Sequence, residues 1–169
     1  HGLNVRLAAR RFLADLGRAR RRTGGFAFDR RQACDACEFI EKLPHVEGKW
    51  KKPTIDLHPS QAFFVAQLFG FRIDGGGRRF TMALYATARK GGKSTLAAAI
   101  LLYCFCCEDE PGARVITAAK TNQQARQVFD PAKAMVQKTP DLREAFGLEP
   151  FANAIVRWPI GGSFKSINS

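Results

Sequence analysis

The chain has 169 residues and a formal net charge of +12 at pH 7, a length sufficient for one domain with a hydrophobic core. No apolar run reaches the roughly 18 residues of a membrane-spanning helix, and no charged-then-apolar leader is visible, so we expect a soluble, intracellular protein. The chain begins with His1 and ends at Ser169 inside an apparent strand pattern, and we expect it to be a fragment of a longer protein.

The positive charge is concentrated in the N-terminal part. Residues 1–52 contain 13 Lys and Arg against 6 Asp and Glu, residues 53–112 contain 6 against 5, and residues 113–169 contain 8 against 4. A basic surface favours a polyanionic partner, of which DNA is the obvious candidate. Solubility, or pairing with an acidic segment outside this sequence, is the alternative explanation.

Two helices are predicted in this basic part. Residues 4–22 carry an apolar stripe at spacings of three and four, which Thr23-Gly24-Gly25 ends. Its arginine-rich side could contact DNA phosphates or a neighbouring subunit, although we favour a solvated helix face. Asp29 is a candidate N-cap for a second helix over residues 30–43, which Pro44 ends. The stripe of the first helix consists of Val5, Leu7, Ala8, Phe12, Leu13 and Leu16.

The five cysteines are predicted to be reduced and structural. Cys34 and Cys37 have the spacing of a zinc-binding pair, but no second pair of cysteines or histidines follows at a suitable distance. Cys104, Cys106 and Cys107 fall in an apolar helix pattern and are expected in the core. An intracellular protein would keep all five reduced.

A third helix is predicted over residues 62–68, with Ser60 as its N-cap. Gln61 is the notable residue there, because a side-chain amide both donates and accepts and can pair with N6 and N7 of adenine. A glutamine on the helix surface is the alternative, and Gln67 is a weaker candidate for the same contact. Residues 71–79 contain three consecutive glycines and are predicted to be a flexible turn.

A strand, a glycine turn and a helix are predicted to follow one another between residues 78 and 105. The run Phe80–Ala86 is apolar and β-leaning, Leu96–Tyr103 favours a helix, and the turn between them reads Ala88-Arg89-Lys90-Gly91-Gly92-Lys93-Ser94-Thr95. This order is the context of a phosphate-binding loop. A surface turn that contains Gly-Gly-Lys by chance is the alternative.

The residue types of this turn suit ATP and Mg²⁺. Gly91 and Gly92 lack a Cβ, so the backbone can approach a phosphate closely. The amides of Gly92, Lys93, Ser94 and Thr95 would point at the phosphates from a helix N-terminus. Lys93 would reach the β- and γ-phosphate oxygens, and the Ser94 hydroxyl would ligate magnesium. One position departs from the generic pattern, which has glycine where this chain has Thr87.

Strands and helices are predicted to alternate after this turn. Residues 113–119 form a second buried strand, joined to the first by a right-handed parallel crossover. Residues 120–137 form a helix that Thr121 or Asn122 caps and that Pro131 kinks or splits. A short helix over residues 141–146 and a strand over residues 153–158 follow.

The run through the glycine turn resembles the ATPase motif of the large terminase subunit of tailed bacteriophages and prophages. That family often replaces the first glycine and writes the loop as Ala/Ser-Arg-Lys-x-Gly-Lys-Ser/Thr, which accommodates Thr87. The segments His45–Trp50 and Thr121–Lys133 are also similar to the family. The resemblance implies an α/β P-loop NTPase with a parallel sheet. Residues 1–52 would be an N-terminal helical region, and residues 53–169 the first portion of an incomplete ATPase domain without the nuclease domain.

The resemblance also implies a function and its residues. The family's motor couples ATP hydrolysis to packaging of viral DNA into procapsids in the cytoplasm of the bacterial host. Gln61 would read adenine, Lys93 and Arg89 would be catalytic by stabilising the γ-phosphate, and Lys90 is the substitute for Arg89. A solvent-exposed basic pair is the alternative for these last two. The implied partners are double-stranded DNA, the portal, the small terminase subunit and further copies in a ring, with no membrane.

One expected motif is not found in this sequence. No Asp-Asp or Asp-Glu pair after four apolar residues follows the turn, although such a pair would bind magnesium and activate the attacking water. We therefore expect this chain to bind nucleotide weakly and not to hydrolyse it at a useful rate. Two rivals stay open: a helicase-type DNA-dependent ATPase, whose loop usually keeps the first glycine, and a non-catalytic nucleic-acid-binding or assembly module with a vestigial loop.

Overall fold

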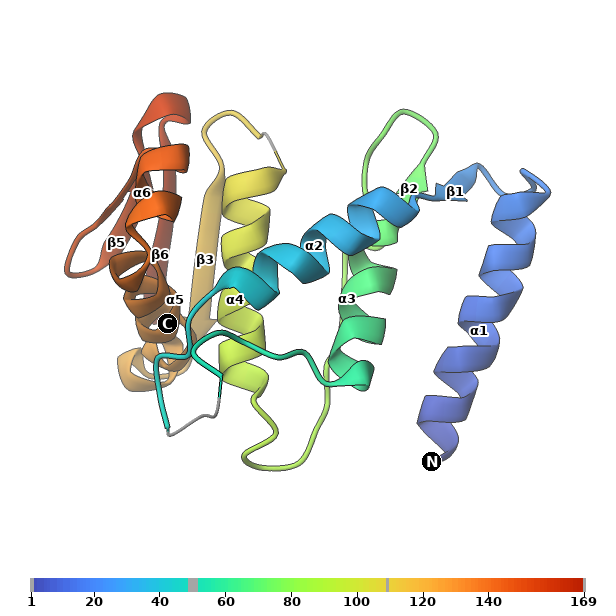
Figure 1. Ribbon diagram of the computed structural model, residues 1–169, viewed down its shortest axis with the longest axis horizontal. Helices are drawn as coiled ribbons and strands as arrows, with labels where there is room; N and C mark the ends of the chain where they lie inside the picture. The colour runs from blue at the N-terminus through green and yellow to red at the C-terminus, as the bar shows by residue number, and fades with distance from the viewer. Residues whose placement is uncertain (1, 49–51, 109, 169) are drawn as a thin grey trace. The chain divides into compact units, whose positions relative to one another are not determined.

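The computed structural model describes residues 2–48, 52–108 and 110–168 (Figure 1). The chain forms two compact units that interleave along the sequence. The first consists of residues 1–38 and 57–85, and the second of residues 39–56 and 86–169. The division into a helical region and an ATPase portion at residue 52 stays a prediction.

The first unit is built from helices around a two-stranded ribbon. It contains α1 (Leu3–Arg20), β1 (Phe26–Phe28), the first part of α2 (Arg30–Lys42), α3 (Pro59–Gly70) and β2 (Phe71–Ile73). β1 pairs antiparallel with β2, so that Phe28 lies opposite Phe71. We predicted residues 71–79 to be a turn, which is wrong for β2, because a strand of three residues is too short to show an alternating pattern.

A cluster of phenylalanines forms the core of this unit. Phe71 is fully buried, and its ring meets those of Phe12, Phe26, Phe28 and Phe80 edge-on at centroid distances of 5.9, 5.8, 4.9 and 5.8 Å. Edge-to-face pairs of this kind add about 0.5–1.5 kcal/mol each beyond the burial of apolar area. The cluster therefore holds α1 to the ribbon and to the segment that follows it.

The predicted apolar stripe of α1 is only partly covered. Phe12 and Leu16 are half-buried, whereas Val5, Leu7 and Leu13 are 53, 50 and 67% exposed. The helix itself and its end before Thr23-Gly24-Gly25 agree with the prediction.

The caps of the next two helices show one confirmed and one wrong prediction. The carboxylate of Asp29 accepts a hydrogen bond from the backbone N–H of Gln32 at 3.1 Å, as predicted for the start of α2. For α3 the N-cap is His58 and not Ser60. The ring Nδ1 of His58 accepts from the backbone N–H of Ser60 at 3.3 Å, and the Gln61 side chain accepts from the backbone N–H of His58 at 3.0 Å. Pro59 occupies the first turn, where its missing N–H is not needed.

The second unit is a mixed α/β structure. It contains α4 (Lys93–Cys107), β3 (Arg114–Ala119), α5 (Asn122–Lys138), α6 (Pro140–Phe146), β4 (Leu148–Pro150), β5 (Ala154–Arg157), a short 3-10 helix (Trp158–Ile160) and β6 (Gly162–Asn168). The strand order is β3-β6-β5-β4. β3 and β6 are parallel, and the other two pairs are antiparallel. Figure 1 shows α4 and α5 beside this sheet.

The core of this unit lies between the sheet and its two long helices. Phe164 of β6 is fully buried and meets Phe105 of α4 and Phe129 of α5 at 6.2 and 5.6 Å. The opposite face of the sheet is not covered, since Ile116 and Ile167 are 51 and 47% exposed. β3 is therefore where we predicted a strand, but it is buried on one face only.

The predicted central strand at Phe80–Ala86 is not formed. Its residues adopt no regular secondary structure, and Met82 and Leu84 are each 91% exposed. A strand requires ladder hydrogen bonds to a neighbour, and no described strand pairs with this run. The predicted crossover from this run to β3 is consequently absent, and the parallel partner of β3 is β6.

α5 is one continuous helix through Pro131. Of the predicted kink or split at this residue, the split is therefore wrong and the kink stays a prediction. The ring of Pro131 is buried together with Ala132 and Met135, and this packing offsets the backbone hydrogen bond that proline cannot donate. The predicted cap is confirmed, because the Thr121 side chain accepts from the backbone N–H of Gln124 at 3.3 Å.

Candidate functional site

The glycine turn before α4 is ordered by two backbone hydrogen bonds. The N–H of Gly91 donates to the carbonyl of Ala88 at 3.1 Å, and the N–H of Leu96 donates to the carbonyl of Gly92 at 2.9 Å. Lys90 and Gly92 adopt left-handed backbone conformations, with φ of +66° and +69°. Turns with such residues aim successive N–H groups toward one concave side, where an anion can bind.

Lys90 is notable because it is not glycine. A residue with a Cβ in the left-handed region is strained by an amount of the order of 1 kcal/mol. Such a conformation persists only where its surroundings hold it. The turn therefore has a defined shape that its neighbours impose, and this is a requirement for a preorganised binding loop.

α4 begins directly at the end of this turn. Gly92 is its N-cap and Lys93 its first residue, and no side chain caps the helix or places an acid in its first turn. The first amides of a helix have no acceptor within the helix, and they carry the positive end of its dipole. The end of α4 is thus electropositive and has N–H groups available to an anion.

The side chains of the turn add further positive charge. Arg89, Lys90 and Lys93 are exposed, while Ser94 and Thr95 are half-buried in the first turn of α4. Three cations and two hydroxyls next to a helix N-terminus can bind a phosphate group. The structure thus brings together the sequence-predicted residues from Arg89 to Thr95.

Gln61 lies outside this cluster, in the first unit of the fold. Its side-chain oxygen accepts the backbone N–H of His58 in the cap of α3, a role that we did not predict. The amide nitrogen remains able to donate to a ligand. A contact of Gln61 with adenine stays a prediction.

Gln67 has a structural role in the same unit. It is 7% exposed, its oxygen accepts from Nη2 of Arg11 at 3.1 Å, and its nitrogen donates to the carbonyl of Phe63 at 3.3 Å. Both ends of the amide are therefore bonded within the fold, which agrees with its lower rank as a ligand contact.

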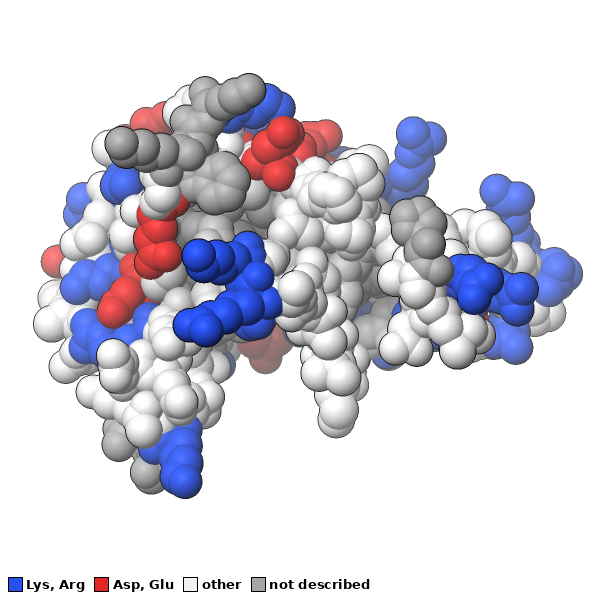
Figure 2. Space-filling view, turned by 90° about the horizontal axis from the view of Figure 1, so that it is seen from below, with Lys and Arg blue, Asp and Glu red and all other residues white. Residues whose placement is uncertain are grey.

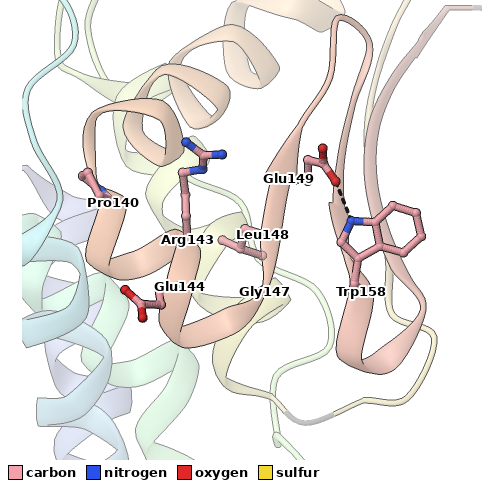
Figure 3. A pocket seen from close by; sticks show the side chains of 7 residues that line it. All are labelled: Pro140, Arg143, Glu144, Gly147, Leu148, Glu149 and Trp158. Atoms are coloured by element: carbon pink, nitrogen blue, oxygen red, sulfur yellow. Dashed lines mark hydrogen bonds between the residues drawn. The ribbon is translucent and has the colours of Figure 1, made fainter.

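Two depressions elsewhere in the second unit were not foreseen. The larger, of about 470 Å³, lies between α6, β4 and the 3-10 helix, where Nε1 of the exposed Trp158 donates to Glu149 at 2.7 Å (Figure 3). The other, of about 430 Å³, lies on the uncovered face of β3 and β6 near Arg114 and Lys165. None of the predicted site residues lines either one.

The described residues contain no group of three His, Cys, Asp or Glu side chains able to hold a metal ion. Magnesium binding through Ser94 stays a prediction. None of the five cysteines forms a disulfide. Cys106 is buried in α4, and this burial raises the pKa of its thiol well above the usual range.

The space-filling view shows where charged side chains lie on one face (Figure 2). Lys and Arg side chains occur in several separate groups on the face drawn in Figure 2, and acidic side chains lie among some of them. No helix within the described ranges is both long and apolar enough to cross a membrane.

Comparison with known proteins gives one consistent result. The family model described as the ATPase domain of the terminase large subunit matches residues 59–146, just over half of the chain. The large terminase subunit of Enterobacteria phage HK97 is 29% identical over 133 residues, which is 78% of this chain and 25% of that protein. The crystal structure of the HK97 large terminase superposes with a TM-score of 0.65 at 26% identity, covering 81% of this chain and 27% of that one. The chain thus spans about a quarter of the length of the relative.

Proposed function

Since this chain belongs to the family of terminase large subunit ATPase domains, we propose that it is the ATP-binding part of a motor that packages viral DNA into procapsids. One structural observation at the glycine turn supports this proposal. The turn from Ala88 to Gly92 has two left-handed residues and leads directly into the uncapped N-terminus of α4. This is the arrangement by which a backbone holds the phosphates of a nucleotide.

The proposed roles follow from the position of each residue in the loop. The amides from Gly92 to Thr95 hold the β- and γ-phosphates, and Lys93 adds a positive charge to them. The hydroxyl of Ser94 binds Mg²⁺. Arg89 is exposed at the start of the turn, from which its guanidinium can reach a γ-phosphate and stabilise the charge that builds up during transfer. Lys90 is the alternative for that role.

Gln61 completes the proposed nucleotide site as the residue that reads adenine. Its amide nitrogen can donate to N7 of the base while its oxygen serves the cap of α3. Such a double role would couple the start of α3 to the bound base.

The experiment that tests nucleotide binding uses a fluorescent ATP analogue and the wild-type chain, Lys93→Ala and Lys165→Ala. Lys165 lies on β6, away from the loop in sequence and outside the proposed site, and it controls for the loss of one positive charge. We expect Lys93→Ala to weaken binding by roughly tenfold or more, because hydrogen bonds to charged groups contribute about 1.5–3 kcal/mol. Lys165→Ala should bind like the wild type. Equal affinities of wild type and Lys93→Ala would refute the proposal and favour a module with a vestigial loop.

The partners of the motor are part of the same proposal. Double-stranded DNA is the substrate, and the portal, the small terminase subunit and further copies in a ring are the assembly partners, in the cytoplasm of the bacterial host. The net charge of +12 supports a DNA partner. Arg20, Arg21 and Arg22, at the exposed end of α1 and just after it, are candidates for phosphate contacts. Replacing them by glutamine should reduce the salt dependence of binding to duplex DNA.

Hydrolysis requires a carboxylate that activates the attacking water, and no Asp-Asp or Asp-Glu pair directly after four apolar residues follows the loop in this sequence. We propose that the chain alone binds ATP and turns it over at no useful rate. Robust hydrolysis by the 169-residue chain, abolished by Lys93→Ala, would contradict this. A helicase-type ATPase remains the enzymatic alternative, and the family match to residues 59–146 disfavours it.

A further inference from the structure

Thr87 and Gly91 have complementary sizes in the phosphate loop. Thr87 stands where the generic pattern has glycine, and Gly91 stands four residues later. A Cβ added to Gly91 would lie 2.7 Å from Oγ1 and 2.9 Å from Cγ2 of Thr87, and 3.0 Å from the carbonyl oxygen of Ala88. The space that a side chain at position 91 would need is therefore filled by Thr87.

The absence of a side chain at Gly91 is a packing requirement and not a requirement of the backbone. Gly92 has a positive φ, and Gly91 does not. The φ of Gly91 is therefore open to an L-residue. What excludes such a residue is chiefly the contact with Thr87 at 2.7 and 2.9 Å, to which the carbonyl oxygen of Ala88 at 3.0 Å adds.

Rotation of Thr87 cannot remove this contact. A threonine side chain has three staggered positions on Cβ and two heavy γ-atoms to place in them. Both positions that face Gly91 are occupied, by Oγ1 and Cγ2. Every rotamer thus leaves at least one heavy atom against Gly91. Serine, with a single γ-atom, can turn it away, and valine, which has the shape of threonine, cannot.

We infer that Thr87 is a positioning residue of the phosphate loop. Its branched side chain packs on the backbone at Gly91 and limits how far the turn from Ala88 to Gly92 can move. It thereby holds the left-handed Lys90 and presents the amides at the start of α4 to the phosphates. This inference rests on the proposed nucleotide site and adds a residue to it, at the position where the generic loop has no side chain.

The test is a double-mutant cycle on affinity for a fluorescent ATP analogue, with the whole chain and Mg²⁺. Gly91→Ala should weaken binding roughly tenfold, because overpacking costs about 1–3 kcal/mol and 1.4 kcal/mol corresponds to a factor of ten. Thr87→Ala should weaken binding about threefold by loosening the turn. In the Thr87→Ala background, Gly91→Ala should cost clearly less than in the wild type, since the Thr87 γ-atoms are gone and only the carbonyl of Ala88 remains close.

Two further variants separate shape from hydroxyl chemistry. Thr87→Val should bind like the wild type, and Thr87→Val with Gly91→Ala should be as weak as Gly91→Ala alone. Thr87→Ser with Gly91→Ala should recover most of the lost affinity. Thermal unfolding, without nucleotide, of the variants changed at Thr87 alone should show only small shifts, because Thr87 is exposed.

The outcomes distinguish this inference from the proposed function. Three results would overturn the inference while Lys93-dependent binding persists. Gly91→Ala could leave the affinity for the ATP analogue unchanged, or the effects of the two substitutions on affinity could be additive. The variants could also change the unfolding temperature and not the affinity. A wild type that binds no better than Lys93→Ala would overturn the proposed function, and the positioning role would fall with it.

Discussion

Asp15 of α1 and Arg79, which are 64 residues apart in the sequence, form a partly buried ion pair. Nη1 of Arg79 lies 2.9 Å from Oδ2 of Asp15, whose side chain is 2% exposed. The same guanidinium lies over the ring of Phe26, 3.6 Å from its centroid. Arg18 approaches the other carboxylate oxygen at 3.3 Å. The pair ties the basic N-terminal helix to the segment that precedes Phe80–Ala86.

Loss of the Asp15 carboxylate should destabilise the fold. Asp15→Asn leaves Arg79 without its counter-charge among aromatic rings, and breaking a buried pair from one side costs about 3 kcal/mol. Asp35→Asn is the matched control, because Asp35 pairs with Arg31 at 3.8 Å on the surface, where such pairs contribute about 0–1 kcal/mol. Urea unfolding measures both. Equal losses of stability in the two variants would mean that the Asp15–Arg79 pair stabilises the fold no more than the exposed Asp35–Arg31 pair does.

Arg89→Ala should change the preference between ATP and ADP. If the guanidinium reaches the γ-phosphate, its removal weakens ATP binding about tenfold, as expected for a charge-assisted hydrogen bond. ADP binding should change much less, since ADP lacks that group. Competition of each nucleotide against a fluorescent analogue gives both affinities. A parallel loss for ATP and ADP would instead show that Arg89 contributes only general positive charge.

Gln61→Glu separates the two roles of that side chain. Glutamate keeps an oxygen to accept the N–H of His58 in the cap of α3, but it has no N–H to donate to adenine. The variant should therefore keep its unfolding temperature and bind ATP more weakly. Gln61→Ala should weaken ATP binding and also lose about 1 kcal/mol of stability. Unchanged ATP affinity in Gln61→Glu would restrict the residue to capping.

Thiol chemistry should distinguish Cys106 from Cys34. Burial raises the pKa of the Cys106 thiol, so at pH 8 it has less thiolate than an ordinary cysteine, and the thiolate is the reactive form. Cys34 is exposed. With iodoacetamide on the folded chain, tandem mass spectrometry should find Cys34 modified well before Cys106, and unfolding in urea should remove most of the difference. Rapid labelling of Cys106 in the folded state would show that α4 opens readily.

The long helices and the glycine turn before α4 could be predicted because their signals are local. The apolar spacing and the cap at Asp29 are contained in neighbouring residues, and so is the order of Gly91, Gly92, Lys93 and Ser94 before an apolar helix. The same local residues carry the resemblance to the terminase family. Helix propagation and a tight turn depend on interactions over three or four residues, which a single sequence displays.

Tertiary structure alone decided the features that depend on a partner distant in the chain. The β1–β2 ribbon, the parallel pairing of β3 with β6 and the Asp15–Arg79 pair all join segments that no local pattern connects. Phe80–Ala86 shows the converse, since an apolar β-leaning run becomes a strand only when a neighbour accepts its backbone hydrogen bonds. By itself, the sequence determined the helices, the loop and the family. The strand partners and the packing of Thr87 on Gly91 were decided by the tertiary structure. Strand pairing and side-chain packing depend on which residues lie next to one another in the folded chain, and the sequence order does not show this.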